Sequence, residues 1–167
     1  MREDRATEIL KNAILLEKRG HAFYAKVAQQ ATVDAVRKFF NLLAEEELIH
    51  IQMLTEQFKS YHARKRFKAS KFTDQGEFKT VSAILTKDLM RQISAADYEA
   101  AAIAAAMSLE QNAIQVYARR AEEAQDPDEK AFYAWLAQWE TRHLDFLARI
   151  DKELTEAIWY DNSFWPF

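Results

Sequence analysis

The fold is decided by two short stretches, Glu47-Leu-Ile-His50 and Glu140-Thr-Arg-His143. In each stretch a Glu and a His are three residues apart, which on an α-helix places both side chains on nearly the same face, about one turn apart. One metal ion could therefore bind both. Each pair also follows a lone Glu, Glu17 or Glu110, by the same 30 residues. The sequence thus indicates two copies of one half-site.

Apolar residues recur every three or four positions in four segments, and this pattern predicts four amphipathic helices. We expect the first helix from about Asp4 to Gln30 and the second from a capping residue at Thr32. The third should begin near Ser94 to Asp97, and the fourth at Asp126-Pro127, a capping residue followed by a first-turn proline. In the first helix the expected buried stripe is Ile9, Ala13, Glu17, Gly20, Tyr24 and Val27.

Connection lengths predict the topology. Short links within the first and last helix pairs favour two antiparallel hairpins. Residues from about 60 to 94 form a long crossover that can bring the third helix back to the opposite end, with a break at Gly76 and a short helix over Val81 to Ile93. We therefore predict an all-α, ferritin-like four-helix bundle over residues 1–157. An aromatic C-terminal tail over 158–167 could fold back, seal a homodimer interface or dock a partner.

Composition supports one soluble domain. The 167 residues include 49% hydrophobic residues but only two Gly and two Pro, which favours long helices. A net charge of -3 argues against nucleic acid as a partner, although a local basic cluster is present at Arg64, Lys65, Arg66, Lys68 and Lys71. There is no cysteine, no signal peptide and no membrane-length apolar run, so we expect a cytoplasmic protein without membrane attachment.

Four carboxylates and two imidazoles on four helices match the inward-projecting ligands of di-iron and di-manganese bundles. Without metal, four carboxylates in a bundle core would repel one another and lack solvation. Two divalent cations would balance their charge. Oxygen and nitrogen ligands suit iron or manganese and also admit zinc.

With its two E-x-x-H pairs, two lone glutamates and long crossover, the chain resembles the ferritin-like di-iron proteins over essentially its whole length. It is most similar to the rubrerythrin-like branch. The resemblance implies two iron ions as cofactors and a di-iron oxidoreductase that oxidises ferrous iron with peroxide or oxygen. It leaves open which carboxylates bridge the metals. The implied metal ligands and catalytic residues are Glu17, Glu47, His50, Glu110, Glu140 and His143.

The chain departs from the family pattern in two ways. Peroxide-reducing rubrerythrins typically carry a rubredoxin-like domain with four cysteines, and a chain without cysteine requires an external electron donor instead. They also carry an additional third-helix glutamate near the metal, whereas the positions one turn beyond Glu110 are Ala113 and Ile114.

Other functions remain open at this point. The same oxidation could serve iron storage or iron delivery, and a closed shell of many subunits would favour that alternative. A non-catalytic, metal-stabilised binding protein is a second alternative, and hydroxylation of a substrate is conceivable. For the oxidoreductase we expect a homodimer or a higher homo-oligomer.

Three further residues of the first and third helices are candidates for contacts with the ligands. Tyr24 and Tyr117 each lie seven residues after a lone Glu, so they could donate hydrogen bonds to ligand carboxylates, although ordinary burial is favoured over a redox role. His21 lies one turn beyond Glu17, where it could position a carboxylate. Its counterpart is Ile114, which argues against a required ligand.

An acidic run precedes the first histidine. Glu45 and Glu46 flank the stripe and are expected on a solvated face, with Glu46 retained as an acceptor for a ligating histidine. Trp135 and Trp139 flank the fourth stripe, where core packing is favoured over electron transfer. His62 in the basic crossover is expected to be solvated.

Overall fold

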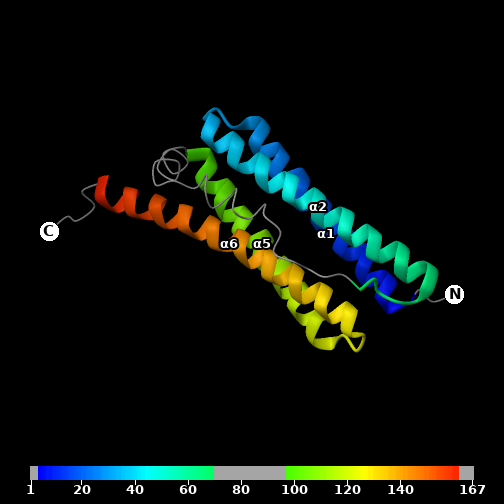
Figure 1. Cartoon of the computed structure of the whole chain (residues 1–167). Helices are drawn as coiled ribbons and strands as arrows, with labels where there is room; N and C mark the ends of the chain where they lie inside the picture. Colours follow the sequence, from blue (N-terminus) through cyan, green and yellow to red (C-terminus); the bar gives the residue numbers. More distant parts are fainter. Residues whose placement is uncertain (1–3, 70–96, 162–167) are drawn as a thin grey trace.

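A computed structural model describes residues 4–69 and 97–161, with backbone only for 97–100, 154 and 157–161. The described residues form four α-helices and no strand: α1 (Arg5–Gln30), α2 (Asp34–Arg64), α5 (Asp97–Glu123) and α6 (Pro127–Asp161). Helices α1 and α2 form one antiparallel hairpin and α5 and α6 form another, and the two hairpins lie against each other (Figure 1). The prediction of an all-α four-helix bundle is confirmed.

Helix starts follow the side chains that can accept backbone N–H groups. Asp4 caps α1 by accepting from the N–H of Ala6 at 3.3 Å. Asp126 caps α6 through its Oδ1, which accepts from the N–H of Asp128 at 2.8 Å, as predicted. Both caps supply a carboxylate at the positive end of the helix dipole, where negative charge is stabilising.

The predicted cap at Thr32 is wrong. The N-cap of α2 is Val33, which makes no side-chain capping bond. Val33 packs against the apolar cluster at this end of the bundle, so burial of its side chain places it at the helix start. In place of a capping bond, Arg37 Nη2 donates to the carbonyl of Ala31 at 3.0 Å and secures the turn.

Two apolar clusters fill the bundle. The first contains Val27, Val36, Phe40 and Leu147, and the second contains Leu10, Leu54, Phe132 and Leu136. At the start of α1 Leu10 is fully buried, whereas Ile9, which was predicted in the stripe, is only half-buried. Each large side chain buried in this way contributes roughly 1.5–3 kcal/mol. The ligand candidates lie between the two clusters.

The long crossover between the hairpins connects opposite ends of the bundle. Helix α2 ends at the end of the bundle where α1 begins, and α5 begins at the other end (Figure 1). Helix α2 continues to Arg64, so the crossover starts later than predicted, after Lys65 in a left-handed conformation with φ 54°. The predicted break at Gly76 and short helix at 81–93 lie outside the described residues.

The C-terminal segment begins as helix. Helix α6 extends to Asp161, so the first residues of the proposed aromatic tail, 158–161, continue that helix. Residues 162–167 lie outside the described residues. The division at 157/158 therefore remains a proposal about function and does not coincide with the end of a helix.

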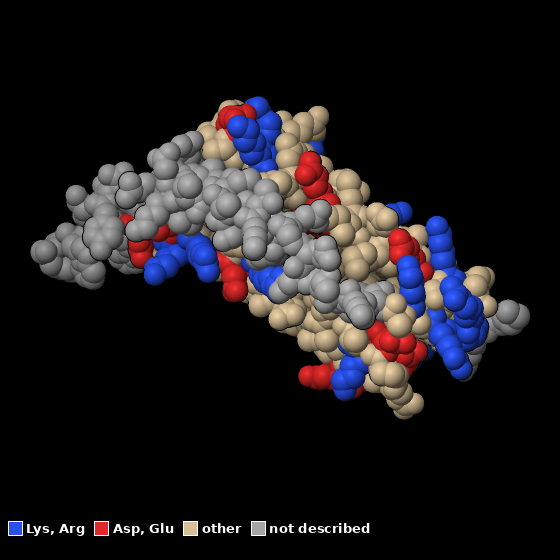
Figure 2. Space-filling model, in the orientation of Figure 1, with Lys and Arg blue, Asp and Glu red and all other residues tan. Residues whose placement is uncertain are grey.

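Basic residues after α2 have acidic neighbours. Lys65 Nζ lies 3.8 Å from Asp4 Oδ2, and Lys68 Nζ lies 3.1 Å from Glu56 Oε2. Figure 2 shows Lys and Arg beside Asp and Glu at this end of the bundle. Exposed pairs of this kind contribute about 0–1 kcal/mol. Among the described helices, none is both long and apolar enough to cross a bilayer.

Candidate metal centre

A polar layer crosses the middle of the bundle between the two apolar clusters. Each of the four helices supplies to it the inward-facing residues predicted from the stripes. All six residues are at most 3% exposed. The structure therefore brings together all of the predicted ligand candidates, which are Glu17, Glu47, His50, Glu110, Glu140 and His143.

Two sets of four ligand atoms lie within 4.8 Å of one another, and each set suits one ion. The first set, here called position A, consists of Glu17, Glu47, His50 and Glu140. The second set, position B, consists of Glu47, Glu110, Glu140 and His143. Glu47 and Glu140 belong to both sets. Each position therefore has its own Glu and His and shares two carboxylates with the other.

The shared carboxylates present one oxygen to each side. Glu140 Oε1 lies 2.9 Å from His50 Nδ1, and Glu140 Oε2 lies 3.0 Å from His143 Nδ1. Glu47 Oε2 lies 3.7 Å from His50 Nδ1, and Glu47 Oε1 lies 3.8 Å from His143 Nδ1. This geometry suits two bridging carboxylates, the point on which the sequence was silent.

Buried polar atoms without hydrogen bonds point into this layer. Among the described residues, both carboxylate oxygens of Glu140 and Nδ1 of His143 make no hydrogen bond of suitable geometry, although the Glu140 oxygens lie 2.9 and 3.0 Å from imidazole nitrogens. Leaving such atoms unsatisfied costs roughly 1–3 kcal/mol each, and more for charged groups. Two divalent cations would satisfy them and neutralise the four ligand carboxylates. The residues present therefore fit a pair of metal ions.

Electrostatics lead to the same conclusion. Burial and repulsion from Glu140 raise the pKa of Glu110 to about 7 and the pKa of Glu47 well above its ordinary value. Burial alone would lower the histidine pKa values, but Glu140 raises the pKa of His50, and Glu110 that of His143, well above 6.5. Without metal the layer thus holds protons in place of cations, and metal binding must displace them.

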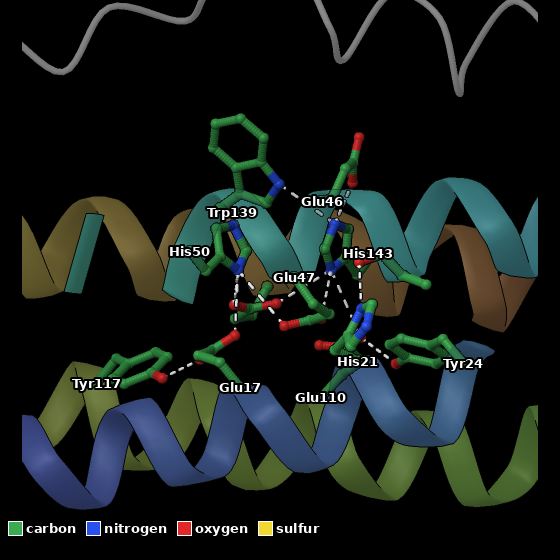
Figure 3. A network of polar contacts seen from close by, with 12 residues as sticks. Glu17, His21, Tyr24, Glu46, Glu47, His50, Glu110, Tyr117, Trp139 and His143 are labelled. Carbon is green, nitrogen blue, oxygen red and sulfur yellow. Dashed lines mark hydrogen bonds and ion pairs between the residues drawn. The ribbon is translucent and has the colours of Figure 1, made fainter. Parts of the chain in front are cut away.

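Tyrosines from opposite hairpins hold the two unshared glutamates. The Tyr24 hydroxyl on α1 donates to Glu110 Oε1 on α5, and the Tyr117 hydroxyl on α5 donates to Glu17 Oε1 on α1 (Figure 3). Both phenols are buried, and burial together with the nearby carboxylates raises their pKa values well above 10. They therefore remain protonated donors. The sequence spacing related each tyrosine to the Glu of its own helix. In the structure each tyrosine hydroxyl instead donates to the Glu of the other hairpin.

Glu46 and Trp139 lie on the outer side of the layer, behind the imidazole of His143. Glu46 is 5% exposed, so the expectation of a solvated face is wrong for Glu46 and right for the exposed Glu45. Glu46 Oε2 contacts His143 Nε2, which agrees with the alternative that Glu46 accepts from a ligating histidine. Trp139 lies on the same side, with Nε1 3.2 Å from His143 Nε2 (Figure 3). The sequence signal for this position is spacing, because Glu46 and Trp139 each precede a ligand His by four residues and so lie about one helical turn from it.

His21 takes no part in either metal position. Its Nδ1 donates to the carbonyl of Ala44 on α2 at 2.9 Å, and the side chain is half-buried. A carbonyl only accepts, so this bond fixes the proton on Nδ1. His21 therefore ties α1 to α2 next to Glu46 and Glu47.

The fold and this layer define a class: helical bundles that hold two metals between carboxylates and histidines contributed by all four helices. The family model for rubrerythrin matches residues 8–151, which cover most of each of the four helices and all six ligand candidates. The chain belongs to the rubrerythrin family. Searches of curated proteins and of solved structures gave no match.

Proposed function

We propose that this protein is a di-iron oxidoreductase that oxidises ferrous iron with peroxide or oxygen and is returned to the ferrous state by an external electron donor. The observation that carries the proposal is the pair of overlapping ligand sets joined by Glu47 and Glu140. Iron bound there would supply one electron per ion. Two ferrous ions would thus reduce one hydrogen peroxide, with two protons, to two waters.

A small cavity favours a small oxidant. It lies between α1 and α5 beside the ligand carboxylates and has a volume of about 20 Å³, room for about one water molecule. Gly20 and Ala113, each one turn after an unshared Glu, leave this space open. A molecule as small as peroxide or oxygen fits this cavity, and an organic substrate would not fit inside it. Its walls are Leu16, Glu17, Gly20, Tyr24, Glu47, Leu109, Glu110, Ala113 and Glu140.

The chain's own residues would hold the centre in place during the reaction. Tyr24 and Tyr117 fix Glu110 and Glu17 by donating hydrogen bonds, so each unshared carboxylate presents a defined oxygen. The buried setting excludes bulk water, which strengthens every charge interaction in the layer. Since the sequence contains no cysteine, no thiolate-bound iron in this chain can supply the reducing electrons.

The test is a single-turnover experiment on protein loaded with ferrous iron under anaerobic conditions and mixed rapidly with peroxide or oxygen. We expect one peroxide consumed for every two irons, a new near-ultraviolet ferric absorption, and no second turnover until a reductant is added. Glu110→Ala should lose the reaction. His62→Ala is the matched control, because His62 is exposed and stacks on Phe58 at 6.1 Å.

Other outcomes discriminate between the alternatives. Protein that binds two irons but reacts with neither oxidant contradicts the oxidoreductase and favours a metal-stabilised binding protein. Protein that goes on to retain many irons per chain after oxidation favours iron storage. Manganese or zinc found in protein isolated from its native source would contradict iron as the metal.

A further inference from the structure

The two metal positions have matching ligands but different surroundings. Each has one Glu and one His of its own, and the two shared carboxylates serve both. The residues that lie behind the two imidazoles, on the side away from the shared carboxylates, differ between the positions. Glu46 and Trp139 occupy equivalent places, one residue before Glu47 and Glu140, yet one is a carboxylate and the other an indole. Any difference in affinity between the positions must therefore come from such surrounding residues.

At position B the outer nitrogen of the imidazole has a carboxylate partner. His143 Nε2 contacts Glu46 Oε2, and both side chains are buried. An ionised carboxylate only accepts, so Nε2 carries a proton, and Nδ1 is left to present its lone pair to a metal ion once that ion displaces the Nδ1 proton. A carboxylate behind a ligating histidine fixes the ring and raises its basicity.

Trp139 competes for the same nitrogen. Its indole N–H lies 3.2 Å from His143 Nε2 and can only donate, so it suits the tautomer with a bare Nε2. That tautomer carries its proton on Nδ1, where it would block metal binding. Glu46 and Trp139 thus favour opposite tautomers of His143, and Glu46 favours the one that can bind metal.

At position A the outer nitrogen of the imidazole has no such partner. His50 Nε2 is buried without a hydrogen bond among the described residues. The ring instead meets the indoles of Trp139 and Trp135 almost perpendicularly, with centroids 5.2 and 6.2 Å away. An aromatic neighbour is at best a weak acceptor for an N–H group. His50 therefore lacks the carboxylate that supports His143.

We propose that Glu46 is a positioning residue that makes the two metal positions unequal, so that a divalent cation binds first at position B and second at position A. This inference rests on the proposed metal centre. It predicts that the two ions bind in a fixed order. The first ion binds through His143, the histidine that Glu46 orients, and this ion then fixes Glu47 and Glu140 for the second ion.

The test uses Co²⁺ alone, followed by calorimetry and by visible absorption, which reports on the coordination of each ion. The wild type should bind in two steps. Glu46→Gln, nearly the same in shape, should weaken the first step about 10- to 100-fold and leave the second unchanged. Glu45→Gln, one residue away and exposed, should change neither step. Trp139→Glu should strengthen the second step by providing His50 with a carboxylate.

Location is tested separately by anomalous scattering from crystals grown with one equivalent of Co²⁺. We expect the peak beside His143. A peak beside His50, two equal steps in the wild type, or Glu46→Gln weakening both steps alike would overturn the inequality and leave the metal centre intact. Absence of any Co²⁺ binding by the wild type would instead overturn the centre itself. Circular dichroism confirms folding of each variant, and Glu46→Gln remains informative if Trp139→Glu does not fold.

Discussion

The hairpin of α1 and α2 and the hairpin of α5 and α6 are alike at the metal centre and different at their turns. Equivalent residues are 93 positions apart, as Glu17 and Glu110 are. The register extends to the turns, because α1 and α5 end at Gln30 and Glu123 while α2 and α6 begin at Asp34 and Pro127. The duplicated sequence pattern therefore accompanies equivalent helix boundaries at the turn of each hairpin.

The turn ends show what the duplication leaves free. In the first hairpin Val27 and Val36 are buried in one apolar cluster. Their counterparts in the second hairpin are Arg120 and Glu129, where Arg120 Nη2 lies 2.5 Å from Glu129 Oε1. An apolar contact and a nearly buried ion pair thus serve at the same place. At the turns, either an apolar contact or an ion pair can join the two helices, whereas the central layer requires particular ligand atoms.

The largest expected effect comes from removing a shared ligand. Glu140→Ala should abolish binding of both metals, whereas Glu17→Ala should leave one ion at position B, because Glu140 belongs to both ligand sets and Glu17 to one. Metal should stabilise the wild type by about 4 kcal/mol at a free concentration 1,000 times its Kd. Metal analysis together with melting temperatures measures both. Equal stoichiometry in the two variants would contradict the shared role of Glu140.

A second test removes the ion pair that distinguishes the turn of the second hairpin from that of the first. Arg120→Ala leaves the carboxylate of Glu129 buried without its partner and should lower the free energy of unfolding by about 3–5 kcal/mol. The double variant Arg120→Val with Glu129→Val copies the first hairpin and should be neutral or more stable than the wild type. Urea unfolding monitored by circular dichroism gives both values. A double variant as unstable as the single one would mean that the two ends are not interchangeable.

The pH dependence of stability should differ between the metal-free and the metal-bound protein. The pKa of Glu110 is about 7 in the folded chain and near 4.5 when unfolded, so the folded metal-free protein binds more protons between these values. The two histidines, whose pKa values are also raised, act in the same direction above pH 6.5. The melting temperature of metal-free protein should therefore fall as pH rises from about 5 to 8.

Metal competes with those protons, so the stabilisation added by Mn²⁺ should grow over the same pH range. Glu110→Gln, which cannot titrate, should flatten the metal-free slope. Differential scanning calorimetry at several pH values, with and without Mn²⁺, measures both effects. A metal-free melting temperature that rises between pH 5 and 7 would contradict the raised pKa of Glu110.

The smallest effect concerns Gly20 and its counterpart Ala113. A Cβ at Gly20 would lie 3.3 Å from Glu47 Cδ, so Gly20→Ala requires Glu47 to move by a few tenths of an ångström. Without metal the carboxylate can move, and the helix should gain about 0.5–1 kcal/mol. With metal bridged by Glu47 it cannot, so Co²⁺ binding should weaken. Ala113→Gly should lower stability by a similar amount and leave Co²⁺ affinity unchanged. Unaltered Co²⁺ affinity in Gly20→Ala would show that Glu47 is not held by the ions.

Much of the fold was predictable because local rules determined it. Periodicity placed Glu17 and Glu110 inside apolar stripes, and Asp126 before Pro127 marked a helix start, since both signals depend on residues within a turn or two. The cap at Thr32 failed because the helix begins one residue later, after Val33, which packs against an apolar cluster. The expectation of a solvated Glu46 failed because Glu46 flanks the stripe on its own helix, and its burial depends on contact with α6.

The sequence by itself determined the helices, the duplicated register and the six inward-facing candidates for two ions, because helical periodicity and spacing are properties of one segment at a time. Only the tertiary structure decided the contacts between hairpins. It paired Tyr24 with Glu110, placed Glu46 behind His143 and gave Glu47 and Glu140 an oxygen facing each imidazole. Those contacts depend on how two packed hairpins are oriented, and no spacing along one chain segment encodes that orientation.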